Sequence, residues 1–221
     1  MAACDLSFFC APLPAPRIGV SACLMGQRVR YDGTDKQQPA LFERIAPHAE
    51  LIALCPEATL GIPRPPIHLL ETRHGLRAIE VDNPTHDVTD HLHAFNNNQR
   101  AVLNTLCGVI LKARSPSCGI GNAPVAGAAG TQRSGLFAGF IAREYPWIPM
   151  MDESALHDPH QAAWFVSNAR LVCDAQLAIS RQLFKEFLAH HTRTWETPRQ
   201  PFCDLAQLRA YVIQQQQAAS V

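Results

Sequence analysis

Short hydrophobic runs alternate with amphipathic stretches along the first 150 residues of the chain. The runs typical of buried strands lie at residues 17–22, 50–54, 107–111 and 147–151. Between them, apolar residues recur at helical spacing at residues 39–45, 87–106 and 136–144. Alternating strands and helices predict an α/β fold, because each crossover helix returns the chain to a parallel strand. We therefore expect a Rossmann-like, open, mostly parallel sheet with helices on both faces.

Three segments depart from this alternation. Residues 67–71 and 76–81 alternate around His74-Gly75, which predicts a hairpin, and three prolines in residues 61–66 predict a stiff extended loop. After residue 154 the pattern predicts two helices, at 159–190 and 204–217, joined by a proline-bearing loop. The expected organisation is an N-terminal tail at 1–16, an α/β domain at 17–153 and a C-terminal helical extension at 154–221.

Three cysteines lie where predicted strands end. Cys23 follows the strand at 17–22, Cys55 follows the strand at 50–54, and Cys118 lies in a serine- and proline-rich turn after the strand at 107–111. The carboxyl ends of parallel strands meet at one edge of a sheet, where loops diverge around a crevice. The sequence therefore predicts that three thiols share one crevice, where they could hold a metal ion or an iron–sulfur cluster.

The other five cysteines lack this setting. Cys4 and Cys10 lie in the predicted tail, Cys173 and Cys203 in helical patterns, and Cys107 in an apolar run where a thiol usually serves as a small hydrophobe. Eight cysteines in 221 residues are too dilute for a disulfide scaffold, so we expect free, metal-bound or catalytic thiols in a reducing compartment.

Charged residues close to these cysteines are candidates for further chemistry. Glu57 comes two residues after Cys55, and near a metal centre its carboxylate could serve as a general base. Arg28 and Arg30 follow Cys23; they could bind a polar or anionic substrate, or be solvent-exposed charges beside a turn. The pattern alone leaves these alternatives open.

Composition narrows the range of partners and compartments. Lys and Arg together number 19, as do Asp and Glu, and the net charge of zero argues against a broad surface for duplex nucleic acid. No hydrophobic run approaches the length of a membrane span, and the N-terminus lacks the basic region of a signal peptide. We expect a cytoplasmic protein that binds neither a membrane nor duplex nucleic acid.

Five strings, taken in order, resemble the thiouracil desulfidase family over residues 17–151. They are Ser21-Ala-Cys23-Leu, Arg30-Tyr-Asp-Gly33, Cys55-Pro-Glu57, Gly61-Ile-Pro-Arg-Pro-Pro66 and Ser115-Pro-Ser-Cys118-Gly. The resemblance implies a [4Fe–4S] cluster held by Cys23, Cys55 and Cys118, with the fourth iron left open for the sulfur of a substrate. It also implies catalytic roles for Glu57 and Ser115.

The expected reaction is the non-redox, hydrolytic removal of sulfur from a thiolated uracil, giving uracil and hydrogen sulfide from 2-thiouracil. Glu57 would activate water, and Ser115 would orient the base or relay a proton. The partner is then a small thiolated nucleobase. Two alternatives stay open: a zinc-binding, non-catalytic module, and a tRNA sulfur-transfer enzyme, although the neutral charge counts against a large RNA substrate. The motifs leave open the physiological substrate, the oligomeric state and the role of residues 154–221.

Overall fold

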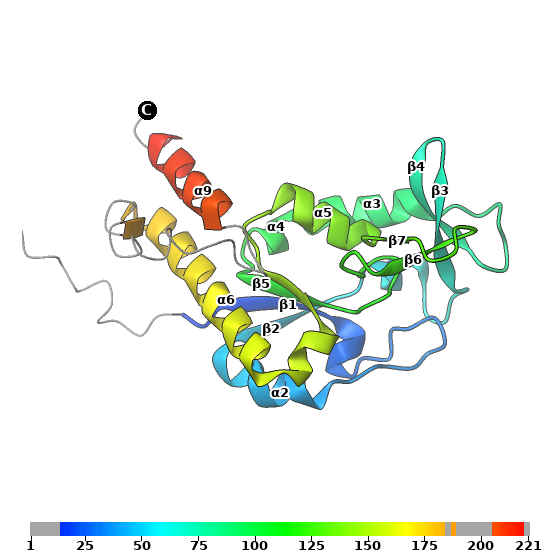
Figure 1. The fold of residues 1–221 in the computed structure, drawn as a ribbon, viewed down its shortest axis with the longest axis horizontal. Coiled ribbons are helices and arrows are strands. Elements are labelled where there is room, and N and C mark those ends of the chain that lie inside the picture. The colour runs from blue at the N-terminus through cyan, green and yellow to red at the C-terminus, as the bar shows by residue number, and fades with distance from the viewer. Residues whose placement is uncertain (1–13, 184–186, 189–204, 219–221) are drawn as a thin grey trace, which may run out of the picture.

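A four-stranded parallel sheet forms the centre of the protein (Figure 1). The computed structural model describes residues 14–183, 187–188 and 205–218, so Cys4, Cys10, Cys203 and the predicted loop before the last helix lie outside the described residues. The strand order is β2-β1-β5-β8, and each neighbouring pair is parallel. The strands are β1 (Arg17–Ser21), β2 (Glu50–Leu54), β5 (Gly108–Leu111) and β8 (Met150–Asp152).

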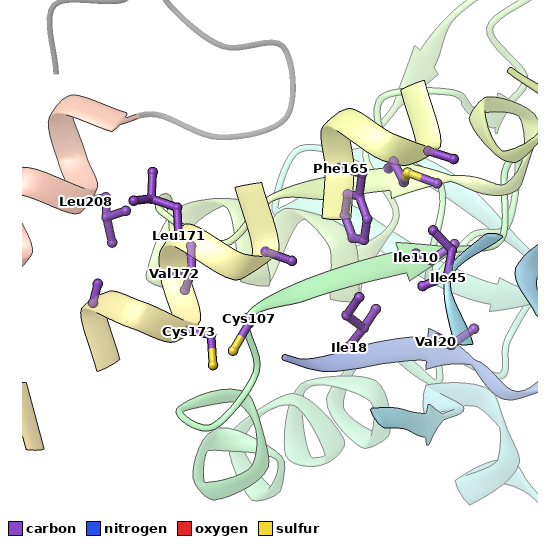
Figure 2. Packing of buried hydrophobic residues seen from close by; sticks show 14 of the residues in the cluster. Ile18, Val20, Ile45, Cys107, Ile110, Phe165, Leu171, Val172, Cys173 and Leu208 are labelled. Atoms are coloured by element: carbon purple, nitrogen blue, oxygen red, sulfur yellow. The ribbon is translucent and has the colours of Figure 1, made fainter. Parts of the chain in front are cut away.

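Helices cover both faces of this sheet, which confirms the predicted α/β class. The helices are α2 (Pro39–Arg44), α3 (Thr89–Asn98), α4 (Arg100–Leu103), α5 (Leu136–Glu144) and α6 (Pro159–Ser180). Because side chains alternate along a strand, Ile110 of β5 packs in the cluster formed with α2 and α6, whereas its neighbours Val109 and Leu111 pack in the cluster formed with α5. Figure 2 shows the first cluster, in which Phe165 of α6 lies over the sheet.

A second, mixed sheet lies beyond the carboxyl end of the first (Figure 1). Its strands, in the order β4-β3-β6-β7, are β3 (Ile67–Thr72), β4 (Gly75–Glu80), β6 (Ala123–Ala126) and β7 (Gln132–Arg133). The predicted hairpin is β3–β4. The sequence did not predict β6 and β7, because both are very short and Pro124 interrupts the strand pattern of β6.

Three predicted element boundaries were wrong. The helix expected at 87–106 breaks at Gln99 into α3 and α4, after the run Asn96–Asn98 of low helix propensity. The predicted helix at 159–190 is interrupted: α6 ends at Ser180, because Gln182 adopts a left-handed conformation with φ of 59°. Residues 187–188 are helical again, and the predicted end at residue 190 lies outside the described residues. β8 begins only at Met150, since the predicted strand residue Trp147 lies in a turn.

Short 3₁₀ helices and a C-terminal helix complete the described structure. They are η1 (Ala22–Met25), η2 (Ala46–His48), η3 (Pro56–Leu60), η4 (Glu153–His157) and α9 (Leu205–Ala218). α9 packs against α6, and Tyr211 of α9 stacks on Trp147 with 4.2 Å between ring centroids. No helix within the described ranges is long and apolar enough to cross a bilayer.

Candidate functional site

Three neighbouring strands of the parallel sheet each deliver one thiol to the same place. Cys23 lies in η1, directly after β1; Cys55 joins β2 to η3; and Cys118 lies in the loop that follows β5. All three side chains line one cavity of about 340 Å³ at the carboxyl ends of these strands. The predicted convergence of the three thiols is therefore observed, while their role as ligands stays a prediction.

Burial raises the pKa of all three thiols, because a thiolate is poorly solvated inside the protein. Burial and the nearby Cys55 raise the pKa of Cys23 to about 11, and the charges of Arg30 and Lys112 oppose this shift. Burial also raises the pKa of Cys55 and of Cys118. In the case of Cys118, a hydrogen bond with Ser21 opposes the shift. Thiols in this state bind a metal centre by exchanging their protons for metal ions.

A glutamate and a serine from different loops meet beside the thiols. The hydroxyl of Ser115 donates a hydrogen bond to Oε1 of Glu57 over 3.0 Å, and both residues line the cavity. The other carboxylate oxygen, Oε2, accepts from Nη2 of Arg64 over 2.6 Å. The Glu57 side chain keeps only 15% of its surface exposed and that of Arg64 only 4%, so solvent screens this ion pair weakly.

The Ser115 hydroxyl also shapes the loop that carries Cys118. Its oxygen accepts hydrogen bonds from the backbone N–H groups of Ser117, over 3.2 Å, and Cys118, over 3.1 Å. One hydroxyl therefore links the third thiol to Glu57. Substitution of Ser115 is expected to disturb both the position of Cys118 and the hydrogen bonding of the carboxylate.

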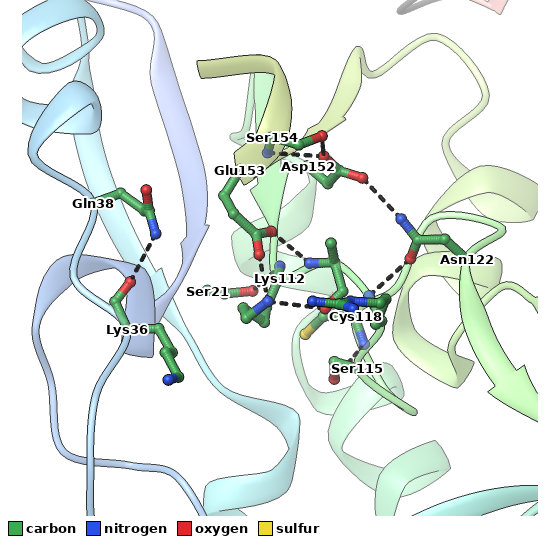
Figure 3. A network of polar contacts seen from close by, with 12 residues as sticks. Ser21, Lys36, Gln38, Lys112, Ser115, Cys118, Asn122, Asp152, Glu153 and Ser154 are labelled. Atoms are coloured by element: carbon green, nitrogen blue, oxygen red, sulfur yellow. Dashed lines mark hydrogen bonds and ion pairs between the residues drawn. The ribbon is translucent and has the colours of Figure 1, made fainter. Parts of the chain in front are cut away.

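Residues from β8 and the start of η4 brace the same loop from the other side (Figure 3). The ammonium group of Lys112 pairs with Glu153, whose second oxygen accepts from the N–H of Ala113 over 2.5 Å. Asn122 donates to Asp152 over 2.8 Å and accepts from the N–H of Arg114 over 2.8 Å. Arg114 needs this support, because its φ of 59° lies in the left-handed region, which non-glycine residues seldom adopt.

The structure separates the two arginines that follow Cys23. Arg30 lines the cavity, where its guanidinium contacts Thr34 and Asp32, whereas Arg28 is exposed and does not line the cavity. The ring of Tyr31 also lines the cavity and stays 40% exposed. Arg30 therefore fits the predicted role at a substrate site, and Arg28 fits the alternative of a surface charge.

Sequence comparison identifies the family of the chain. The family model described as 2-thiouracil desulfurase matches residues 18–153. The chain belongs to the 2-thiouracil desulfurase family. A solved structure described as the [4Fe–4S]-dependent thiouracil desulfidase TudS is similar, with a TM-score of 0.53 and 27% sequence identity; the match covers 67% of this chain and 97% of TudS. No curated protein sequence matches the chain significantly.

Two residues of this 2-thiouracil desulfurase site were missed by sequence reasoning. Arg64 was treated only as part of a proline-rich loop, yet its guanidinium binds both Glu57 and, over 3.0 Å, the carbonyl oxygen of Val29. The signal was a lone charge among prolines in an otherwise apolar string. Ser21 ends β1, contacts Cys118 and accepts from the N–H of Lys112 over 3.0 Å. A small polar residue at the end of a buried strand was its only signal.

The donor set of this site suits an iron–sulfur cluster. Cys23, Cys55 and Cys118 are free thiols, and thiolates are the ligands that iron–sulfur clusters use. Among the described residues, no three Cys, His, Asp or Glu side chains converge closely enough for a single metal ion. A zinc ion needs its sulfur ligands about 2.3 Å away on all sides, whereas a cluster lets each cysteine bind a different iron. The residues present therefore fit a cluster.

Proposed function

We propose that this chain is a [4Fe–4S]-dependent desulfidase that removes sulfur from a thiolated uracil by hydrolysis. One observation carries the proposal: three thiols from neighbouring strand ends share a cavity with a hydrogen-bonded pair formed by Glu57 and Ser115. Membership of the 2-thiouracil desulfurase family supports it, as does the likeness to TudS. The substrate proposed for this chain is a small thiolated nucleobase, with 2-thiouracil as the compound to test first.

Cys23, Cys55 and Cys118 would hold the cluster, and its fourth iron would carry no protein ligand. When bound, the cluster supplies a soft Lewis acid that polarises a thiocarbonyl group, because sulfur is a preferred ligand of iron. A fourth protein ligand would block this position, just as catalytic zinc sites keep one position open. Free thiols of this kind suit a reducing compartment such as the cytosol.

Glu57 is the general base of the proposed reaction. The guanidinium of Arg64 binds one carboxylate oxygen, which fixes the orientation of the group and leaves Oε1 toward Ser115. Glu57 accepts a proton from a water molecule, and the resulting hydroxide attacks the carbon of the C=S group. A buried ion pair keeps the carboxylate in one place for this step, and orientation of this kind contributes strongly to rate.

Ser115 is the proton relay. Its hydroxyl donates to Glu57 and accepts from two backbone N–H groups, so it can pass a proton from the tetrahedral adduct to the carboxylate or back to the departing sulfur. The C–S bond then breaks, a C=O bond forms, and the two protons of water leave with sulfur as hydrogen sulfide. The reaction consumes one water and transfers no electrons overall.

The test is anaerobic reconstitution of the full chain with iron and sulfide, followed by incubation with 2-thiouracil. We expect a brown protein with broad absorbance in the visible blue, uracil as product, and hydrogen sulfide in equal amount. The matched control is Glu57→Gln, which replaces the carboxylate by an amide of the same shape and should keep the colour while losing turnover.

Two other outcomes would contradict the proposed function and favour a different one. A colourless protein that purifies with zinc bound would make the cavity a zinc module and overturn the cluster assignment. A brown protein that releases no sulfide from thiolated bases, yet adds sulfur to tRNA, would make it a sulfur-transfer enzyme.

A further inference from the structure

Apart from the three thiols at the cavity, a pair of thiols lies elsewhere, with the two sulfur atoms facing each other (Figure 2). Cys107 directly precedes β5, and Cys173 lies in α6, which crosses the face of the sheet. Both thiols are free, and only 2% of the Cys107 surface and 6% of the Cys173 surface are exposed. The proposed desulfidase chemistry uses neither.

The protein holds the two segments that carry these thiols firmly together. Gln176, one turn after Cys173, donates to the carbonyl oxygen of Leu106 over 3.0 Å and accepts from the Cys107 thiol over 3.4 Å. Gly108 permits the close approach of α6, because a Cβ there would lie 2.8 Å from the ring of Phe165. The two sulfurs thus belong to elements that are already fixed against each other.

Charge around the pair favours a reactive thiolate on one side. The hydrogen bond with Cys107 lowers the pKa of Cys173, and the guanidinium of Arg170 lowers it further, against the effects of burial and of the Asp174 carboxylate. The same hydrogen bond and burial raise the pKa of Cys107. Arg170 is itself anchored, since it binds Asp174 and donates to the carbonyl oxygen of Pro14 over 2.7 Å. Arg170 places a positive charge near Cys173, whereas the Cys107 thiol donates a hydrogen bond to Gln176. Cys173 is therefore the attacking thiol and Cys107 the resolving one.

We propose that Cys107 and Cys173 form a reversible disulfide, with hydrogen peroxide as the oxidant and a dithiol as the reductant. The thiolate of Cys173 attacks one oxygen of peroxide, which gives a sulfenic acid and releases the other oxygen as water after protonation. The sulfur of Cys107 then attacks the sulfenic sulfur and loses its proton; an S–S bond forms, and the hydroxyl leaves as water. Two thiols and one peroxide give one disulfide and two waters.

This disulfide would join the segment that the family model matches to a segment beyond it. Cys107 lies inside the segment matched by the family model, whereas Cys173 lies beyond it. The bond would tie α6 covalently to the start of β5, the strand whose other end leads to Cys118. Oxidation would thereby restrain the unfolded chain by closing a long loop, and raise the stability of the fold around the cavity.

The experiment uses the reconstituted full chain under an anaerobic atmosphere, treated with increasing amounts of peroxide and then alkylated in denaturant. Peptide mass mapping should show a species in which the peptides that contain Cys107 and Cys173 are joined, with a loss of two hydrogen atoms. Dithiothreitol should reverse it. The midpoint of thermal unfolding should rise by about 5 °C or more in the oxidised form. Visible absorbance, recorded in parallel, separates these changes from any loss of the cluster.

Two matched variants, Cys107→Ser and Cys173→Ser, complete the test. Each should lack the linked peptides and show no peroxide-dependent rise in unfolding temperature. The proposal is overturned if, in the chain without substitutions, both thiols remain free after peroxide and are therefore alkylated. It is also overturned if Cys173 is joined to a different cysteine. A linked pair with no thermal shift would equally overturn the stabilising role. These outcomes do not depend on desulfidase activity, so they are independent of the proposed function.

Discussion

Cys118 and Cys107 lie near opposite ends of strand β5, and both are buried, yet their surroundings have little in common. At the carboxyl end, Cys118 sits in a loop whose polar groups face a cavity, beside the hydroxyls of Ser21 and Ser115. At the amino end, Cys107 packs among apolar side chains, and its partners in α6 are the Cys173 thiol and the side-chain oxygen of Gln176. The same residue type on the same strand therefore meets two different chemical environments.

Burial alone therefore does not determine the chemical role of a cysteine in this protein. The ends of three parallel strands bring Cys23, Cys55 and Cys118 together, and cations such as Lys112 offset the charge that thiolates would carry. The pair at the other end lies in the hydrophobic core, where the two sulfurs face each other and Gln176 accepts a hydrogen bond from Cys107. Three thiols at a cavity can bind a cluster, whereas two thiols that face each other in a packed core can form a disulfide. Variants at the two ends of β5 test this contrast.

The largest effect is expected from removing a cavity thiol. Cys23→Ser, Cys55→Ser and Cys118→Ser should each abolish the visible absorbance of the reconstituted protein and lower sulfide release by more than about 100-fold, because each removes a ligand. Cys107→Ser is the control at the other end of the sheet and should keep its colour. A colourless Cys107→Ser protein would show that the two groups of thiols are assigned wrongly.

Glu57→Gln should separate chemistry from cluster binding. The amide cannot accept a proton from water, so kcat should fall by about 10²- to 10⁴-fold while the absorbance and the iron content stay unchanged. Steady-state kinetics and iron analysis on the same sample provide the measurement. Loss of iron together with activity would make Glu57 a structural residue and remove it from the mechanism.

Arg64→Lys should have a smaller effect on the same step. Lysine keeps the positive charge but cannot bind Glu57 and the carbonyl oxygen of Val29 at once, so the carboxylate becomes less well oriented. We expect kcat to fall by about 10- to 100-fold with little change in KM or absorbance. A change confined to KM would instead assign Arg64 to substrate binding.

The smallest effect is expected from Cys107→Ala. Loss of one buried sulfur should lower the free energy of unfolding by about 1 kcal/mol, measured by denaturant titration of the reduced protein, and leave sulfide release nearly unchanged. A fall in activity comparable with that of a cavity variant would remove the contrast between the two ends of β5.

Much of this organisation was predictable from the sequence, because the relevant signals are local. Hydrophobic runs predicted β1, β2 and β5, and residues directly after each run predicted where the thiols meet. Glu57 was a candidate base because of its position after Cys55, and the resemblance implied catalytic roles for Glu57 and Ser115, but the hydrogen bond between them was not predicted. The roles of the five predicted site residues, and the division at residues 16 and 153, stay predictions.

The features that the sequence did not predict depend on contacts between segments far apart in the chain. Arg64 and Val29 are brought together by folding, and no local pattern pairs them. The sequence placed Cys107 in an apolar run and Cys173 in a helical pattern without pairing them, because only the packing of α6 on the sheet brings them face to face. Strands β6 and β7 were missed because they are held by neighbouring strands and not by a hydrophobic pattern of their own.

The position of α6 has a practical consequence for protein engineering. The matched family segment ends at residue 153, which makes that point an inviting place to shorten the chain or to attach a fusion partner. However, Phe165 and Val172 fill the same core as Ile18 and Ile110, so a cut there would leave one face of the central sheet open to water. We expect truncated versions to aggregate, and fusions to succeed only when the junction lies beyond Ser180.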